Sequence, residues 1–554
     1  MVFEEIKSGE LNGPSGGIDL PSFCDLHSAS EMGNLSRVKV ILSQRGTDIN
    51  CNEWIGRTPV MWAAGSGHRE VVELLVSKGA NESIVDRFDN NILHSAGRGG
   101  DVEVVQYVLS HDLVDINVRG SCRRTPVMVA AENGHREIVK LLVDKGGDMS
   151  LVDEKNDNIL HLACLCGQKE VVKYVLSQDI VDINGRGRQT TTPVMLAARN
   201  GHKEVVELLV KKGADLSLAY NTPGSNVLHL ACFYGHVDVV KYLLSQDTVD
   251  VNSRGRYKQT PMMRAAKNGH KEVVELLVKK GADLSLAYNA DGSNVLHLAC
   301  VNGHVDVVKY LLSQDTVNIN SRGWRKRTPM MRAAEEGYKE VVELLVSKGA
   351  DASLVDKRGN NLLHLACQRG QMELVKYIVS QDMVDINRRG LKKRSPVMIA
   401  AESGHKEVVE LLVNKGADAS LMDKKGNNIL HLACQMGHVE VVKYVLSQDI
   451  VDINSRGWKT KTPMMMAAEE GHKEVVELLL NKGTDPSLVD KRGNNILHLA
   501  CQNGQMEVVK YIVSKVIVDV NAKNKRRKTA ANIASSQGRE DLIDLLVSHG
   551  AHMS

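Results

Sequence analysis

The chain has 554 residues, which exceeds the size at which a single hydrophobic core stops growing, so it must form several domains or an array of repeats. Its composition, 43% apolar and 25% charged, is that of an ordinary soluble protein, and no stretch approaches the roughly 18 apolar residues that a membrane-spanning helix needs. The net charge of +3 gives, by itself, no reason to expect a polyanionic partner.

The first 22 residues differ in character from the rest of the chain. They contain acidic residues, no apolar run and the segment NGPSGG, so they predict a disordered lead-in rather than a signal peptide. The ten cysteines would suit a secreted disulfide protein, but without a secretory signal they indicate a reducing compartment. We therefore expect a cytoplasmic protein, with the nucleus as the alternative.

From residue 23 to residue 551 the sequence repeats itself, and residues 552–554 form a short tail. A Thr-Pro pair, once Ser-Pro and finally Thr-Ala, recurs every 67 or 68 residues. Each step contains two related segments of 33 to 35 residues, which gives sixteen units including a degenerate first one. The pairs begin at Thr58, Thr125, Thr192, Thr260, Thr328, Ser395, Thr462 and Thr529.

Each unit predicts two short helices followed by a turn. Thr is a good N-cap residue, and Pro at the next position has a backbone angle already suited to a helix start. The second helix, as in KEVVELLV at 203–210, places Val and Leu on one stripe, and the Lys-Gly that follows supplies a left-handed C-terminal glycine. The next eight to twelve residues are rich in Asp, Asn and Gly and predict a turn.

This pattern resembles the ankyrin repeat, because TPLHxAAxxGHxxVVxLLLxxGADxN can be laid over nearly every unit. The resemblance implies an all-α repeat solenoid over 23–551, in which helix-turn-helix units stack and β-hairpin-like fingers project to one side. The last unit, TAANIASSQGREDLIDLLVSHGA, is more polar than the others and would cap the array. The resemblance also implies a scaffold that binds other proteins.

The units depart from the family pattern in an orderly way. One type keeps Thr-Pro and has Met where His is expected, whereas the other keeps the His and opens with Asn. The structural period is therefore a double unit, and hydrogen bonding by this His should alternate along the stack. The Met positions include Met61, Met263 and Met331, and the His positions begin at His94 and His161.

The segment HLAC occurs six times, first at His161–Cys164, and raises the alternative of metal or redox sites. In the resembled pattern the Cys occupies a crowded alanine position, where a small thiol packs well. The pairs recur only in alternate units, so four ligands cannot converge on a zinc ion. We interpret the cysteines as packing residues and predict no metal and no cofactor.

The His of GHKE-type segments recurs at the end of the first helix, where we expect it to bond to backbone carbonyls. Gln168, Gln371, Gln505 and Tyr338 replace it in single units, which a shared catalytic role would have to explain. No nucleotide-binding, nucleophile-elbow or zinc-protease motif occurs. We therefore predict no catalytic residues and no enzymatic activity.

Positive charge is concentrated in the turns that join an HLAC-type unit to the next Thr-Pro unit. These seven segments together carry 25 Lys and Arg and no Asp or Glu, whereas the alternating turns, such as VDKRGNN, are nearly neutral. A solenoid would arrange them as a stripe of basic finger tips, which is either a surface for an anionic partner or a solvated edge. The candidate residues in this stripe are Trp324, Arg325, Lys326, Arg327, Lys392, Lys393, Arg394 and Trp458.

In the resembled family the first helices and the finger bases form the concave surface. The variable first-helix positions here are basic and aromatic in the middle of the chain and acidic further on, which suits peptide recognition, although such positions also vary where nothing constrains them. The basic and aromatic candidates are Arg199, Phe233, Tyr234, Arg264, Lys267 and Arg332, and the acidic ones are Glu335, Glu336, Glu402, Glu469 and Glu470.

These observations lead to two main hypotheses. The first is a monomeric, non-enzymatic scaffold that binds a protein or peptide, acidic in its contact segment, through the concave face and the basic finger tips. The second is direct binding of nucleic acid or of an anionic membrane surface through the same stripe, for which no nucleic-acid-reading motif is present. A metalloprotein built on HLAC is the third and least favoured alternative.

Overall fold

The computed structural model describes residues 23–111, 114–220, 224–286 and 292–552. The predicted lead-in at 1–22 and the last two residues of the tail lie outside these ranges. Within them the chain forms thirty-two α-helices and no β-strand. The predicted all-α repeat fold with sixteen helix pairs is confirmed.

No helix among the described residues combines the length and the apolar character that crossing a lipid bilayer would require.

The chain divides into two compact units, residues 1–256 and 257–554. The first unit contains α1 (Phe23–Glu31), α2 (Leu35–Leu42), α3 (Pro59–Gly65), α4 (Arg69–Ser77), α5 (Ile92–Gly99), α6 (Val102–Ser110), α7 (Pro126–Asn133), α8 (Arg136–Asp144), α9 (Ile159–Leu165), α10 (Lys169–Ser177), α11 (Pro193–Arg199), α12 (Lys203–Lys211), α13 (Val227–Tyr234) and α14 (Val237–Leu243).

The second unit contains α15 (Pro261–Lys267), α16 (Lys271–Lys279), α17 (Val295–Val301), α18 (Val305–Leu311), α19 (Pro329–Glu336), α20 (Lys339–Ser347), α21 (Leu362–Gln368), α22 (Met372–Ser380), α23 (Pro396–Glu402), α24 (Lys406–Asn414), α25 (Ile429–Met436), α26 (Val439–Ser447), α27 (Pro463–Glu470), α28 (Lys473–Asn481), α29 (Ile496–Asn503), α30 (Met506–Ser514), α31 (Ala530–Ser536) and α32 (Glu540–Ser548).

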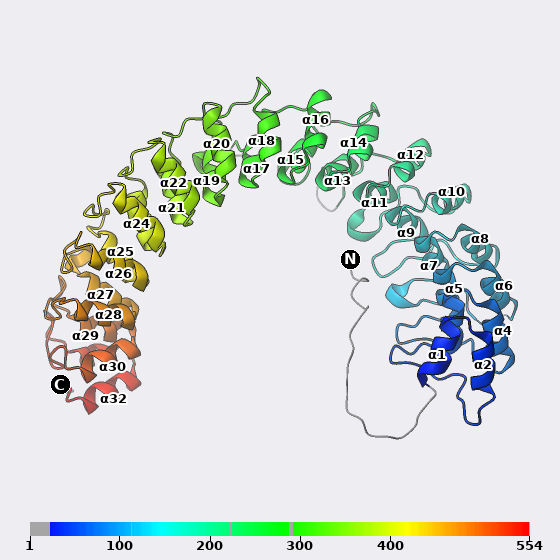
Figure 1. The fold of residues 1–554 in the computed structure, drawn as a ribbon, viewed down its shortest axis with the longest axis horizontal. Coiled ribbons are helices and arrows are strands. Elements are labelled where there is room, and N and C mark those ends of the chain that lie inside the picture. The colour runs from blue at the N-terminus through cyan, green and yellow to red at the C-terminus, as the bar shows by residue number, and fades with distance from the viewer. Residues whose placement is uncertain (1–22, 112–113, 221–223, 287–291, 553–554) are drawn as a thin grey trace. The chain divides into compact units, whose positions relative to one another are not determined.

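Within each unit the odd-numbered helices pack against one another as one row, and the even-numbered helices form a second row behind them (Figure 1). The first helix of a pair is buried almost all round, as in α11, where Val194 to Ala198 are fully buried. The second helix buries a single stripe, which in α12 consists of Val205, Val206 and Leu209. Since one pair cannot bury its own apolar surface, each pair depends on its neighbours for stability.

The helix starts predicted from Thr-Pro are found where expected, with Pro as the first helical residue. The hydroxyls of Thr328 and Thr462 accept a hydrogen bond from the backbone N–H three residues later, at 3.3 Å. The hydroxyls of Thr58 and Thr125 are instead buried without a hydrogen-bond partner among the described residues. At those two starts the preset backbone angle of Pro, rather than the cap, favours the helix.

The predicted alternation of His and Met is visible in the hydrogen bonds. In HLAC-type units Nε2 of the His reaches the next finger, as in His94 to Arg124 O at 2.9 Å and His297 to Arg327 O at 3.1 Å. In Thr-Pro units the Met sulfur accepts the N-cap backbone N–H instead, as Met263 Sδ does from Thr260 at 3.5 Å. The His of one type of repeat therefore links a basic finger to a helix. The Met of the other type makes a hydrogen bond only within its own helix start.

Candidate interaction surfaces

The tips of the basic fingers are two-residue turns with an unusual backbone. In the finger at 320–327, Gly323 N donates to Arg327 O at 2.9 Å, which closes a hairpin around Arg325 and Lys326. Both tip residues have left-handed φ angles, 57° and 58°, which L-residues other than glycine adopt only at an energetic cost. The same turn occurs at Cys122–Arg123, Gln189–Thr190, Tyr257–Lys258, Lys392–Lys393 and Lys459–Thr460.

Three of these tips in the second unit, those at Arg325, Lys392 and Lys459, are bonded to the finger that follows. The backbone N–H groups of Lys357, Lys424 and Lys491 donate to tip carbonyls of the preceding finger at 2.7 to 3.0 Å. The Arg directly before the finger glycine strengthens this link, because Arg322 donates to Val355 O at 2.8 Å. Arg119, Arg186, Arg389 and Arg456 make the corresponding bond to a carbonyl 33 residues further on. The fingers are therefore held as fixed pairs.

In four of the seven basic fingers, the basic residue directly before the Thr-Pro or Ser-Pro pair forms ion pairs inside the protein. Arg327, whose side chain is 4% exposed, pairs with Glu335 of α19 and with Asp356 of the next finger, at 3.6 Å for the latter. Arg332 adds a second bond to Glu335, at 2.7 Å. The equivalent pairs are Arg124 with Glu132 and Asp153, Arg394 with Glu402 and Asp423, and Lys461 with Glu469.

This network divides the predicted site residues into two groups. Arg327, Arg332 and Arg394 have internal acidic partners, and three of the five predicted acidic positions, Glu335, Glu402 and Glu469, are those partners. The tip residues Lys326, Lys392 and Lys393 are exposed and have no ion pair among the described residues. Position within the finger therefore decides which charges face solvent.

The alternating fingers of the second unit are more basic at the surface than the sequence indicates. In the finger at 356–361, Asp356 is buried against Arg327, whereas Lys357 and Arg358 are exposed. The neutral appearance of VDKRGNN is therefore misleading, because its negative charge lies inside. The other exposed pairs of this kind are Lys424–Lys425 and Lys491–Arg492. The second unit thus displays cations on both kinds of finger.

The first unit shows no such uniform edge. Its fingers at 86–91 and 153–158 expose Phe88 and Glu154 beside single basic residues, and the tip Gln189–Thr190 is uncharged. The concentration of exposed positive charge therefore belongs to the second unit, which the total count of Lys and Arg could not indicate.

The two predicted finger tryptophans lie against cations of their own finger and, for Trp458, also of the preceding finger. The guanidinium of Arg325 is 4.0 Å from the centre of the Trp324 ring, and Trp324 is 41% exposed. Around Trp458 lie the amino groups of Lys459 at 3.9 Å and Lys425 at 4.2 Å. Cations so placed are attracted to the ring face, and the exposed part of each indole remains available for contacts.

In the first unit, three predicted residues lie close together on the row formed by the first helices of the pairs. Phe233 and Tyr234 of α13 make an edge-to-face ring contact at 4.9 Å, and the guanidinium of Arg199 from α11 lies 5.4 Å from the Tyr234 ring. In the second unit α15 carries Arg264, which is half-buried, and Lys267, which is exposed.

The recurring His and Cys residues have structural environments. The GHKE-type His bonds to a carbonyl of the preceding repeat, as His438 does to Glu402 O at 2.9 Å, and Gln168 and Gln505 make the same bond at 3.0 Å. All six HLAC cysteines are fully buried, and burial raises the pKa of Cys501 to about 12. The described residues contain no cluster of three or more His, Cys, Asp or Glu able to hold a metal ion.

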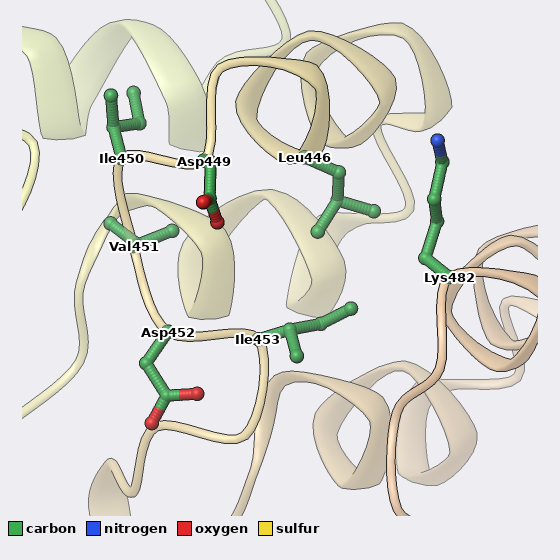
Figure 2. A pocket seen from close by; sticks show the side chains of 7 residues that line it. All are labelled: Leu446, Asp449, Ile450, Val451, Asp452, Ile453 and Lys482. Atoms are coloured by element: carbon green, nitrogen blue, oxygen red, sulfur yellow. The ribbon is translucent and has the colours of Figure 1, made fainter.

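A cleft on the second unit has no equivalent among the predicted sites (Figure 2). It measures about 340 Å³ and is lined by Asp449 and Asp452 from one loop and by Lys482 from the segment opposite. Asp452 accepts the backbone N–H of Asn454 at 2.9 Å, a turn that recurs at the other VDIN segments.

Sequence reasoning missed two residues, Trp54 and Trp62, which line a second cavity, in the first unit. Trp54 occupies the same finger position as Trp324 and Trp458, and Trp62 the same helix position as Arg332. Aligning the first two sequence repeats with the later ones would have shown that both tryptophans occupy these positions.

Comparison with known proteins gives one consistent result. A family model described as ankyrin repeats (three copies) matches residues 26–120, 127–220, 194–288, 285–356, 330–423, 398–490 and 464–554, which together cover nearly the whole chain.

Curated relatives include three large proteins. Transient receptor potential cation channel subfamily A member 1 of Homo sapiens is 26% identical over 498 residues, which cover 79% of this chain and 43% of the relative. E3 ubiquitin-protein ligase KEG of Arabidopsis thaliana is 26% identical over 73% of this chain and 25% of its own length. Ankyrin repeat and KH domain-containing protein mask-1 of Caenorhabditis elegans is 32% identical over a region that covers 76% of this chain and 18% of the relative. The chain thus spans less than half the length of each.

Proposed function

Because this chain belongs to the ankyrin-repeat family, whose repeats generally mediate protein–protein interaction, we propose that it is a non-enzymatic scaffold whose second unit binds an acidic protein segment along its finger tips. The observation that carries the proposal is the separation of charge within the fingers at 320–327 and 387–394. Acidic partners hold Arg327 and Arg394 inside, whereas the tip cations Lys326, Lys392 and Lys393 face solvent.

Rigid display of these cations favours recognition of an extended anionic segment. The tip backbone is fixed by its turn and by the bond to the next finger, so little conformational entropy is lost when a partner binds. A row of like charges also attracts an oppositely charged chain over several ångströms and speeds its association. Within the first unit, Arg199, Phe233 and Tyr234 are candidates for a second contact, and Lys267 is a separate candidate within the second unit.

The test uses tip variants that remove charge without weakening the fold. Lys392→Asn with Lys393→Gly introduces the residue pair preferred in this turn, so the hairpin should become more stable while two cations are lost. Combined with Lys424→Ser and Lys425→Ser, this change should weaken binding of a fluorescent 20-residue poly-glutamate peptide about tenfold at low salt, as measured by anisotropy.

Two controls separate charge from structure. Gln189→Asn with Thr190→Gly makes the same turn change at an uncharged tip, and Lys406→Ser with Lys443→Ser removes two cations from the second helices. Both should leave binding unchanged. Equal affinity in the tip variant would overturn the proposal, and so would tighter binding of a duplex oligonucleotide or of phosphatidylserine vesicles than of poly-glutamate.

A further inference from the structure

A cavity in the first unit differs in chemistry from everything on the basic edge. It measures about 500 Å³, within the usual range of ligand sites. Its walls come from α1, from the loop before α3 and from α3 itself. The lining residues are His27, Ser28, Glu31, Asn52, Glu53, Trp54 and Trp62. Two of the four tryptophans of the chain are therefore in this one place.

The first finger, at residues 50–57, contains an acidic and an aromatic residue, Glu53 and Trp54, where the later fingers are mainly basic. At the position of Glu53 six of the seven later basic fingers have glycine, such as Gly120, where a Cβ would lie 2.4 Å from the Asn90 side chain of the preceding finger. No finger precedes the first one within the described part of the chain, so this position can hold a long carboxylate. Asn52 likewise stands where the later fingers have an Arg that bonds to the next finger, such as Arg119.

Two polar atoms in the cavity are buried without partners. Oε1 of Glu53 and Nε1 of Trp62 are both inaccessible and make no hydrogen bond with any described residue. Such groups are rare in folded proteins and call for an explanation, because an unpaired buried donor or acceptor costs free energy. Oε1 of Glu53 is a negatively charged acceptor and Nε1 of Trp62 is a donor, so the wall of the cavity contains polar groups that the fold leaves unsatisfied.

The charge balance of the cavity is negative. Neither Glu31 nor Glu53 forms an ion pair with a described residue. The nearby Arg57 is balanced by the buried Asp86 at 3.7 Å, and its guanidinium lies 5.1 Å from the centre of the Trp62 ring. An internal cation thus already lies against one indole, while Trp54 is 70% exposed.

We propose that this cavity, the Trp54–Trp62 pocket, binds a cationic side chain, lysine or arginine, of a partner polypeptide. The side chain would lie against Trp54, where a cation is attracted to the aromatic face, and its charge would be paired with the carboxylate of Glu53. The ligand is opposite in charge to the one proposed for the finger tips, and the two proposals stand independently.

The experiment observes the indole groups directly. The full chain is labelled with ¹⁵N-tryptophan, so that four indole N–H signals are recorded, and each is assigned with a Trp→Phe variant. The probes are capped tripeptides, Gly-Lys-Gly, Gly-trimethyllysine-Gly, Gly-Arg-Gly and Gly-norleucine-Gly, the last having the same length of apolar chain without the charge.

We expect the Trp54 and Trp62 signals to shift and saturate with at least one cationic tripeptide, at a Kd in roughly the millimolar range that suits so small a ligand. Glu53→Gln, which keeps size and removes charge, should weaken this binding at least fivefold. Trp458→Ala, the matched finger position beside lysines, should not change it. Equal shifts with norleucine, the absence of any shift with all three cationic probes, or full binding by Glu53→Gln would overturn the proposal.

Discussion

Glu82 is a buried acidic residue at a position where other repeats have apolar side chains. Its side chain is 2% exposed, and both carboxylate oxygens are without hydrogen-bond partners in the described structure. Corresponding positions in later repeats hold apolar side chains, among them Met149, Leu216 and Leu284. Burial raises the pKa of Glu82, and the nearest basic group, Nδ1 of His111, is 3.8 Å away.

Glu82→Leu should therefore stabilise the first unit. The change replaces a buried, unpaired carboxylate by the side chain that its neighbours already use, so we expect a gain of about 1–3 kcal/mol at pH 7. Urea unfolding followed by circular dichroism measures it. The reverse change in a matched position, Leu216→Glu, should destabilise by a similar amount. A Glu82→Leu protein no more stable than the parent would contradict this account.

At the scale of elements, one buried cation joins two fingers and a helix. Arg327 belongs to the finger at 320–327, Glu335 to α19, and Asp356 to the next finger. The side chain of Asp356 is fully buried, and the carbonyl of Arg327 also accepts from His297 at 3.1 Å. The ion pair and the His bond therefore fix the finger to the helices on both sides.

Arg327→Ala should be strongly destabilising, by about 3–5 kcal/mol, because it leaves Asp356 charged and buried without its partner. The control is Lys326→Ala, one residue away at the exposed tip, which should change stability little. Thermal or urea unfolding of both variants gives the comparison. If the two variants were equally stable, the network would be incidental to the fold.

The elements themselves could be predicted well from sequence. Period, helix pairs, starting Pro and closing Gly depend on local chemistry that every unit repeats. The tip turns could not, because Arg325 and Lys326 have left-handed angles that favour Asn and Gly, and nothing local marks them. The partner of Arg327 was equally hidden, since Asp356 lies 29 residues further on, in the next finger.

For the whole molecule, the total charge of +3 conceals a strongly uneven surface. Counting residues by type identified the basic fingers but treated every Lys and Arg as available. In the structure, cations that pair with internal acidic residues, such as Arg394, are not available to a partner. Conversely, cations in fingers that look neutral in sequence, such as Lys424 and Lys425, are exposed. The sequence therefore identifies which fingers are basic but not which of their cations are exposed. Whether a Lys or Arg is neutralised by an acidic residue depends on contacts between repeats.

The same repetition gives the chain a shared sensitivity to acid. The HLAC-type histidines are buried, and burial lowers the pKa of His94, His297, His364 and His431 to about 4, against a hydrogen bond to a carbonyl that raises it. His161 and His498 shift in the same direction. A histidine whose pKa is lowered by folding contributes stability that is fully present above pH 6.5 and is lost as the pH falls toward 4.

Between pH 7 and pH 5 each such histidine should therefore cost about 2 kcal/mol of folding free energy, since one pKa unit corresponds to about 1.4 kcal/mol. Urea unfolding at the two pH values measures the sum. In His364→Gln, whose side chain does not titrate, the difference between pH 7 and pH 5 should be smaller by the contribution of one histidine. An unchanged difference would show that His364 is not held neutral in the folded chain.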